Sequence, residues 1–124
     1  MAFKSAIATA VEPPEEQPKP GLPIDLNHLH RQTMGDRHLQ REVLRIFLRH
    51  SAEQIARLRT AESVQDRREA AHSLTGSSKG IGAFTIATIA SEIENAKGPV
   101  VGRLKALEQA AAAARLFIRD FLAE

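Results

Sequence analysis

His72 is the residue of this sequence whose type and surroundings point most clearly to chemistry. It lies in the stretch AAHSLTGSSKGIGA, residues 70–83, among small side chains and shortly before three glycines. Histidine has a reference pKa of about 6.5, so a neutral imidazole is available as a nucleophile at neutral pH. Such an imidazole can accept a phosphoryl group and form a phosphoramidate. The glycines raise the alternative that a loop binds phosphate directly.

The glycine spacing fits neither common loop that binds nucleotide phosphates. A P-loop has the pattern G-x-x-x-x-G-K-[ST] after a buried strand. Gly76 and Gly82 are six positions apart, and no Lys-Ser or Lys-Thr pair follows Gly82. A dinucleotide-binding fingerprint that began at Gly80 would need another glycine where Thr85 stands. We therefore interpret the stretch as part of a helix.

On a helical wheel, at about 100° per residue, this helix divides into a core face and an outward face. His72 falls far from the centre of the core face and is expected to point into solvent. The residues expected to face the core are Val64, Ala71, Leu74, Ser78 and Ile81.

The neighbours of His72 one or two turns away are those that could support a charged group on its ring. Arg68 and Lys79 can offset the charge of phosphoryl oxygens. Gly76 costs the helix about 1 kcal/mol relative to alanine, and its missing side chain would let a second protein approach the imidazole. The other neighbours at helical spacing are Gln65, Glu69 and Thr75.

The segment HSLTGSS (residues 72–78), followed by IGA (residues 81–83), resembles the signature of histidine-containing phosphotransfer (HPt) domains. Those domains are four-helix bundles that relay a phosphoryl group between receiver-domain aspartates in bacterial and plant phosphorelays. The resemblance implies that His72 is the phosphorylated residue and that Gly76 is kept bare for receiver access. Ser73, Gln65 and Thr75 would lie beside the transferred group or the approaching partner.

The resemblance also implies which components come from elsewhere. The partners would be response-regulator receiver domains and a histidine kinase, often a hybrid one. The receiver would supply Mg²⁺ and the acidic residues, and no cofactor of the chain's own is expected. The protein would then be a phosphotransfer carrier without an ATP site or independent turnover.

Thr75 departs from the family pattern. HPt domains usually have lysine or arginine three residues after the histidine, where the cation neutralises the phosphoryl group. We expect Thr75 on the outward face, and we hypothesise that Lys79 or Arg68 takes the place of the missing cation.

The elements that must position these residues are helices. Residues 12–23, EPPEEQPKPGLP, hold five of the six prolines, which end any helix or sheet ladder, so residues 1–23 are predicted to form a flexible arm. Asp25, Asp36 and Ser63 are suitable N-caps. The expected helices are a short one from Asp25 to Gly35, a long one after Asp36, one from Ser63 to about Gly82, one over 83–97 and one over 100–122.

The predicted fold class is all-α. Short loops favour antiparallel neighbours, so residues 24–124 are expected to form an up-down four-helix bundle with a short leading helix. The last helix has apolar residues at alternating spacings of four and three, typical of bundle packing. One chain can close such a bundle, and we expect a monomer.

Composition excludes several other classes of function. Cysteine is absent, so disulfides and thiolate chemistry are excluded. The net charge is +2, with no basic block, which gives no reason to expect nucleic acid binding. No apolar run is long enough for a membrane span, and a cytoplasmic location is expected. His28, His30, His38 and His50 lack metal-ligand spacing, so no metal site is expected.

Two alternative functions remain open from the sequence. The chain could be the dimerisation helix pair of a histidine kinase, although Ser73 stands where such segments usually have an acidic residue. It could also be a bundle that docks receivers with weak or no transfer, and Thr75 is the feature that supports this interpretation.

Overall fold

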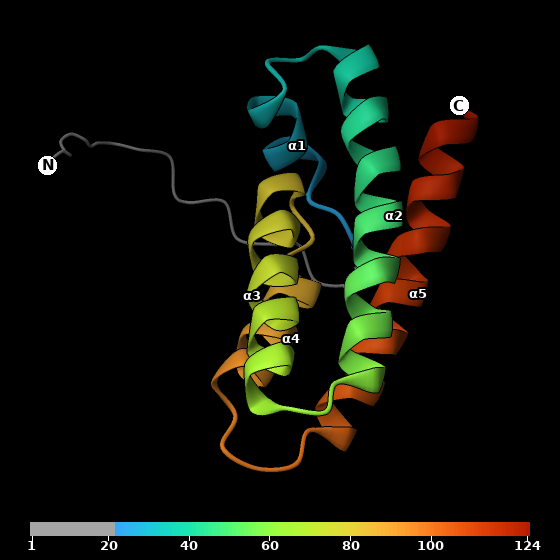
Figure 1. Cartoon of the computed structure of the whole chain (residues 1–124). Helices are drawn as coiled ribbons and strands as arrows, with labels where there is room; N and C mark the ends of the chain where they lie inside the picture. The colour runs from blue at the N-terminus through green and yellow to red at the C-terminus, as the bar shows by residue number, and fades with distance from the viewer. Residues whose placement is uncertain (1–21) are drawn as a thin grey trace, which may run out of the picture.

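The computed structural model describes residues 22–124, and every regular element in that range is a helix (Figure 1). The prediction of an all-helical protein is confirmed. The arm predicted for residues 1–23 lies almost wholly outside the described residues. The five helices are α1 (Leu26–Gln32), α2 (Arg37–Thr60), α3 (Val64–Ile81), α4 (Phe84–Asn95) and α5 (Val101–Ala123).

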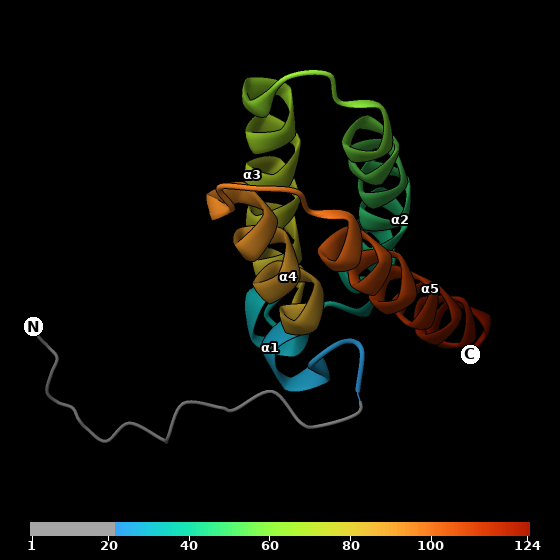
Figure 2. The same ribbon diagram turned by 90° about the horizontal axis from the view of Figure 1, so that it is seen from below.

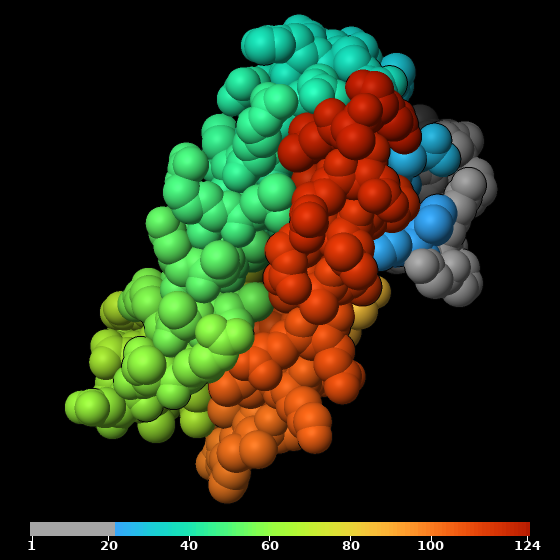
Figure 3. Space-filling model, turned by 90° about the vertical axis from the view of Figure 1, so that its right-hand side faces the viewer, coloured from blue at the N-terminus to red at the C-terminus, as the bar shows by residue number. Residues whose placement is uncertain are grey.

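The helices pack around one apolar core. α3 contacts α2 on one side and α4 on the other, while α5 contacts both α2 and α4. Figure 2 shows α4 between α3 and α5. Figure 3, which looks at the right-hand side of the molecule in Figure 1, shows α2 and α5 side by side. The short helix α1 packs against α3. α3 is therefore held by three other helices, and it carries His72.

Local capping explains where three helices begin. Asp25, Asp36 and Ser63 each occupy the N-cap, as predicted, and each side chain accepts a hydrogen bond from the backbone N–H three residues later. These bonds satisfy N–H groups that have no partner within the helix. The serine bond, from the N–H of Asp66 to Ser63 Oγ, is 3.0 Å long.

The buried face of α3 differs from the wheel prediction at two positions. Val64 was expected in the core but is 51% exposed, because it is the first residue of the helix and lies at the end of the bundle. Thr75 was expected on the outward face but is only 8% exposed. Ala70 is also buried, so the core face of α3 is wider than predicted.

Gly82 ends α3, and its backbone is hydrogen-bonded to Asp25, near the start of the described residues. Its φ is +90°, in the left-handed region that favours glycine. Its carbonyl accepts a hydrogen bond from the N–H of Asp25 at 2.9 Å. A Cβ atom at this position would lie 2.9 Å from the Asp25 carbonyl oxygen. Both the backbone conformation and the close approach of Asp25 require glycine here.

Gly82→Ala is therefore expected to destabilise the fold by at least about 1–2 kcal/mol, the usual cost of a left-handed conformation for a residue with a Cβ. Gly80→Ala is the matched control, because a Cβ there would meet nothing within 4 Å. That control should raise stability by up to about 1 kcal/mol. Urea unfolding followed by circular dichroism measures both, and equal stability of the two variants would contradict this account.

Candidate functional site

His72 lies near the middle of α3 and points into solvent. Its side chain is 78% exposed, which agrees with the wheel prediction. The adjacent residue Ala71 is completely buried, so the helix is fixed to the core directly beside the imidazole. The imidazole is thus accessible to solvent, while the helix beside it is packed against the core.

Glu94, from α4, contacts the imidazole. Its Oε2 lies 2.9 Å from His72 Nδ1, and its side chain is 27% exposed. An ionised carboxylate can only accept hydrogen bonds, so Nδ1 is the nitrogen that carries the proton in this contact. In the neutral ring the other nitrogen, Nε2, then has the free lone pair. In this contact Glu94 orients the ring and leaves Nε2 as the nitrogen with the free lone pair.

Sequence reasoning missed Glu94 because it lies 22 positions from His72 on another helix. The contact depends on how α3 and α4 pack, which the pattern of either helix alone does not reveal. One signal was available: Glu94 directly follows Ile93, which is completely buried. An acidic residue at the edge of a buried helix face is well placed to reach across to the neighbouring helix.

Gly76 lies one turn beyond His72 and leaves the surface open. A Cβ atom there would meet nothing within 4 Å, so packing within this chain does not require glycine. The φ of Gly76 is also not in the left-handed region. Neither packing within the described chain nor the backbone conformation accounts for this glycine.

Arg68 and Lys79 are exposed and lie on the His72 side of α3. Neither forms an ion pair within residues 22–124. Lys79 borders a shallow hollow that it shares with Phe84, Ala87 and Thr88 of α4. Both cations are exposed, Arg68 one turn before His72 and Lys79 two turns after it.

Thr75 does not belong to this exposed group, contrary to the sequence expectation. Its Oγ1 donates a hydrogen bond of 2.8 Å to the carbonyl of Ala71, and the side chain is buried. A threonine hydroxyl is short enough to bond back to its own helix in this way. Thr75 therefore contributes to packing and is not part of the exposed surface around His72.

Two further predicted residues have partners of their own. Ser73 is half-buried, and its Oγ lies 3.2 Å from His50 Nε2 on α2. Gln65 is exposed, but its Nε2 donates a 2.8 Å hydrogen bond to Glu69. Ser73 therefore links α3 to α2 beside His72, whereas Gln65 is bonded to Glu69 two turns before His72.

An apolar stripe on α2 borders α3 next to the His72 face, on the side of Ser73 and Ser77. Leu39, Val43 and Ile46 recur at spacings of four and three, and Leu39 and Ile46 are 40% and 53% exposed. Val43 and Ile46 line a groove of about 300 Å³ between α2 and α3. The remaining residues of the groove are Phe47, His50, Ser77 and Ile81. Because Ser73 lies against His50, the groove begins level with His72.

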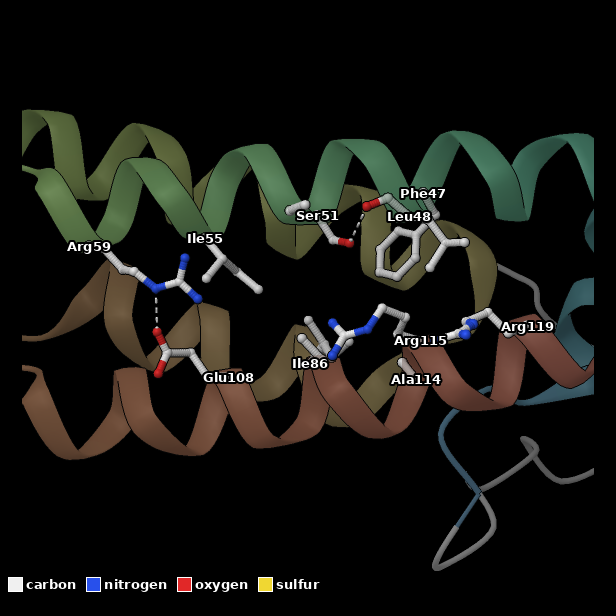
Figure 4. A pocket seen from close by; sticks show the side chains of 12 residues that line it. Phe47, Leu48, Ser51, Ile55, Arg59, Ile86, Glu108, Ala114, Arg115 and Arg119 are labelled. Atoms are coloured by element: carbon white, nitrogen blue, oxygen red, sulfur yellow. Dashed lines mark hydrogen bonds and ion pairs between the residues drawn. The ribbon is translucent and has the colours of Figure 1, made fainter.

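A second cavity, of about 320 Å³, lies between α2 and α5. None of its lining residues comes from α3. Its hydroxyl group, on Ser51, is bonded to the Leu48 carbonyl, and its carboxylate, on Glu108, is paired with Arg59 at 2.6 Å (Figure 4). This cavity therefore offers no free nucleophile or base and is separate from His72.

Residues 22–124 contain no group of three or more histidine or acidic side chains that could hold a metal ion. No helix among the same residues is both long enough and apolar enough to cross a membrane. The features that remain are an exposed, carboxylate-bound histidine on a helical bundle, a bare helix surface beside it and an apolar groove.

A helical bundle with an exposed histidine of this kind is what the sequence resemblance led us to expect. The family model described as the Hpt domain matches residues 42–124, more than half of the chain. The chain therefore belongs to the Hpt domain family, and the resemblance seen in the sequence is confirmed. No curated protein and no solved structure matches it significantly.

Removing the Glu94 carboxylate should release the imidazole of His72. In Glu94→Ala we expect both neutral tautomers of His72 to be populated, because the acceptor at Nδ1 is lost. Nitrogen NMR of the imidazole, recorded at about pH 9 where a reference histidine is neutral, reports the tautomer. Glu92→Ala is the matched control, since Glu92 lies on the same helix but pairs with Arg103. An unchanged spectrum in Glu94→Ala would contradict the assignment.

Proposed function

We propose that this protein is a phosphorelay carrier, which accepts a phosphoryl group on His72 from one receiver-domain aspartate and passes it to another. Hpt domains act generally in histidine phosphotransfer within phosphorelays. The observation that carries the proposal is the 2.9 Å contact between His72 Nδ1 and Glu94, because it leaves Nε2 free and exposed. The proposed scaffold is an up-down bundle of the four longer helices.

The proposed reaction needs no bound cofactor in this chain. The lone pair of His72 Nε2 attacks the phosphorus of an aspartyl phosphate. The bond from phosphorus to Nε2 forms, and the bond to the aspartate oxygen breaks, which returns a free carboxylate to the receiver. Positive charge develops on the imidazole, and Glu94 stabilises it through the proton on Nδ1. The receiver is expected to contribute Mg²⁺ at its own acidic residues.

Lys79 and Arg68 are the cations proposed to offset the charge of the phosphoryl oxygens. The support is their exposure on the His72 side of α3 and their lack of ion pairs in the described chain. A single exposed charge contact is worth on the order of 1 kcal/mol or less. The missing cation at Thr75 should therefore reduce the transfer rate by about tenfold at most.

The apolar stripe of α2 is the surface on which we propose that receivers dock. It combines exposed Ile46 and Leu39 with the groove that begins beside His50. Apolar area that is exposed in the free protein and buried on binding contributes about 25 cal/mol per Å². The adjoining glycines of α3, Gly76 and Gly80, present no side chain that would obstruct a partner.

The direct test is incubation with a panel of phosphorylated receivers, comparing the wild-type protein with His72→Gln. We expect the wild type to acquire an acid-labile, base-stable label and the variant to acquire none. A wild-type protein that binds receivers but stays unlabelled with all of them would instead be a docking bundle without transfer. Labelling by ATP alone would indicate histidine kinase activity and would also contradict the proposal.

Ile46→Asp should weaken receiver docking while the bundle stays folded, because Ile46 is half exposed in the free protein. A charge placed in an apolar interface should raise the receiver concentration needed for half-maximal transfer by about tenfold or more. Leu116→Asp is the matched control, since Leu116 is 59% exposed but lies on α5, away from the groove. If both variants lose transfer equally, the α2 stripe is not the docking surface.

A further inference from the structure

Arg67 holds the end of the helix that carries Glu94. Its Nη2 donates a 2.9 Å hydrogen bond to the carbonyl of Ala96, and its Nη1 donates one of 3.4 Å to the carbonyl of Gly98. Ala96 is the C-cap of α4, and Glu94 precedes it by two positions. A side chain of α3 is thus hydrogen-bonded to the backbone immediately after the last turn of α4.

The last turn of α4 contains no basic residue. The final carbonyls of a helix have no partners within the helix, and a cation near them is favourable both as a donor and against the helix dipole. Arg67, which lies on the neighbouring helix α3, supplies both the hydrogen-bond donor and the positive charge. Its guanidinium group is rigid and planar, so two bonds fix the position of the receiving carbonyls.

We propose that Arg67 is a positioning residue for the phosphoryl acceptor: it fixes the last turn of α4 so that Glu94 remains against His72 Nδ1. Arg67 acts through the backbone, because it forms no ion pair with Glu94 in the structure. Arg67 and His72 are five positions apart on α3, or about 140° around its axis, so they do not share a face. The consequence for transfer rests on the proposed function, but the effect on the imidazole requires no partner.

The first measurement is the tautomer of His72 in Arg67→Gln, by nitrogen NMR at about pH 9. We expect the preference for a proton on Nδ1 to weaken toward that of Glu94→Ala. Arg67→Lys keeps one donor and should restore part of the preference. It also provides a second folded variant if Arg67→Gln unfolds. A full wild-type preference in folded Arg67→Gln would overturn the proposal.

Arg103→Gln is the matched control. Arg103 also joins its helix to α4, through Glu92 at 3.8 Å, but it does not contact the carbonyls at the end of α4. We expect the His72 tautomer and the transfer rate to stay at wild-type values in this variant. A change as large as in Arg67→Gln would show that any loosening of α4 has the same effect, and would remove the specific role of Arg67.

The second measurement is a double-mutant cycle on the transfer rate. Arg67→Gln alone should slow transfer by about three- to tenfold. In the Glu94→Ala background the same substitution should have almost no further effect, because the group that Arg67 positions is already absent. Equal slowing in both backgrounds would mean that Arg67 acts by another route.

The two measurements separate this inference from the proposed function. If no receiver labels His72, the proposed function fails, and the NMR experiment still decides whether Arg67 positions Glu94. If labelling occurs but the tautomer and the cycle show no coupling, the carrier function stands and the role of Arg67 is wrong.

Discussion

The contact between His72 Nδ1 and Glu94 depends on the packing of α3 against α4, and the rest of the site depends on that contact. The two helices bury small side chains, among them Ala70 and Ala71 on α3 and Ala87 and Ala90 on α4. Small residues let helix axes approach closely. Gly82 makes the turn between the helices, and Arg67 holds the far end of α4. The imidazole is therefore oriented by tertiary structure rather than by its own helix.

The parts of this arrangement that depend on neighbouring residues could be predicted from the sequence. The caps at Asp25, Asp36 and Ser63 and the exposure of His72 follow from local spacing. Thr75 was placed wrongly because a wheel assigns one narrow core face, whereas α3 contacts α1, α2 and α4 and is buried over a wider arc. Glu94 and Arg67 could not be found, since their roles depend on contacts between residues more than twenty positions apart.

Several local features of the chain lower its stability, and no interaction within the described fold compensates for them. Gly76 weakens the interior of α3 although a larger side chain would fit. Ile46 and Leu39 leave apolar surface in water. Departures from local optimality of this kind tend to occur where function requires them. Ile46 lines the groove between α2 and α3, and Gly76 lies on α3 one turn beyond His72, so both lie where the proposed docking would place the receiver.

The position of Glu94 also resolves an electrostatic conflict at the site. A carboxylate beside a phosphoryl group would repel it, but Glu94 binds Nδ1 while the transferred group would be bonded to Nε2, on the other side of the ring. The ring between them carries the positive charge that both anions favour. Because His72 is largely exposed, this stabilisation is screened and worth on the order of 1 kcal/mol. The proposed carrier would benefit from that modest value, since strong stabilisation of the phosphorylated ring would hinder transfer to the next aspartate as much as it assisted the first step.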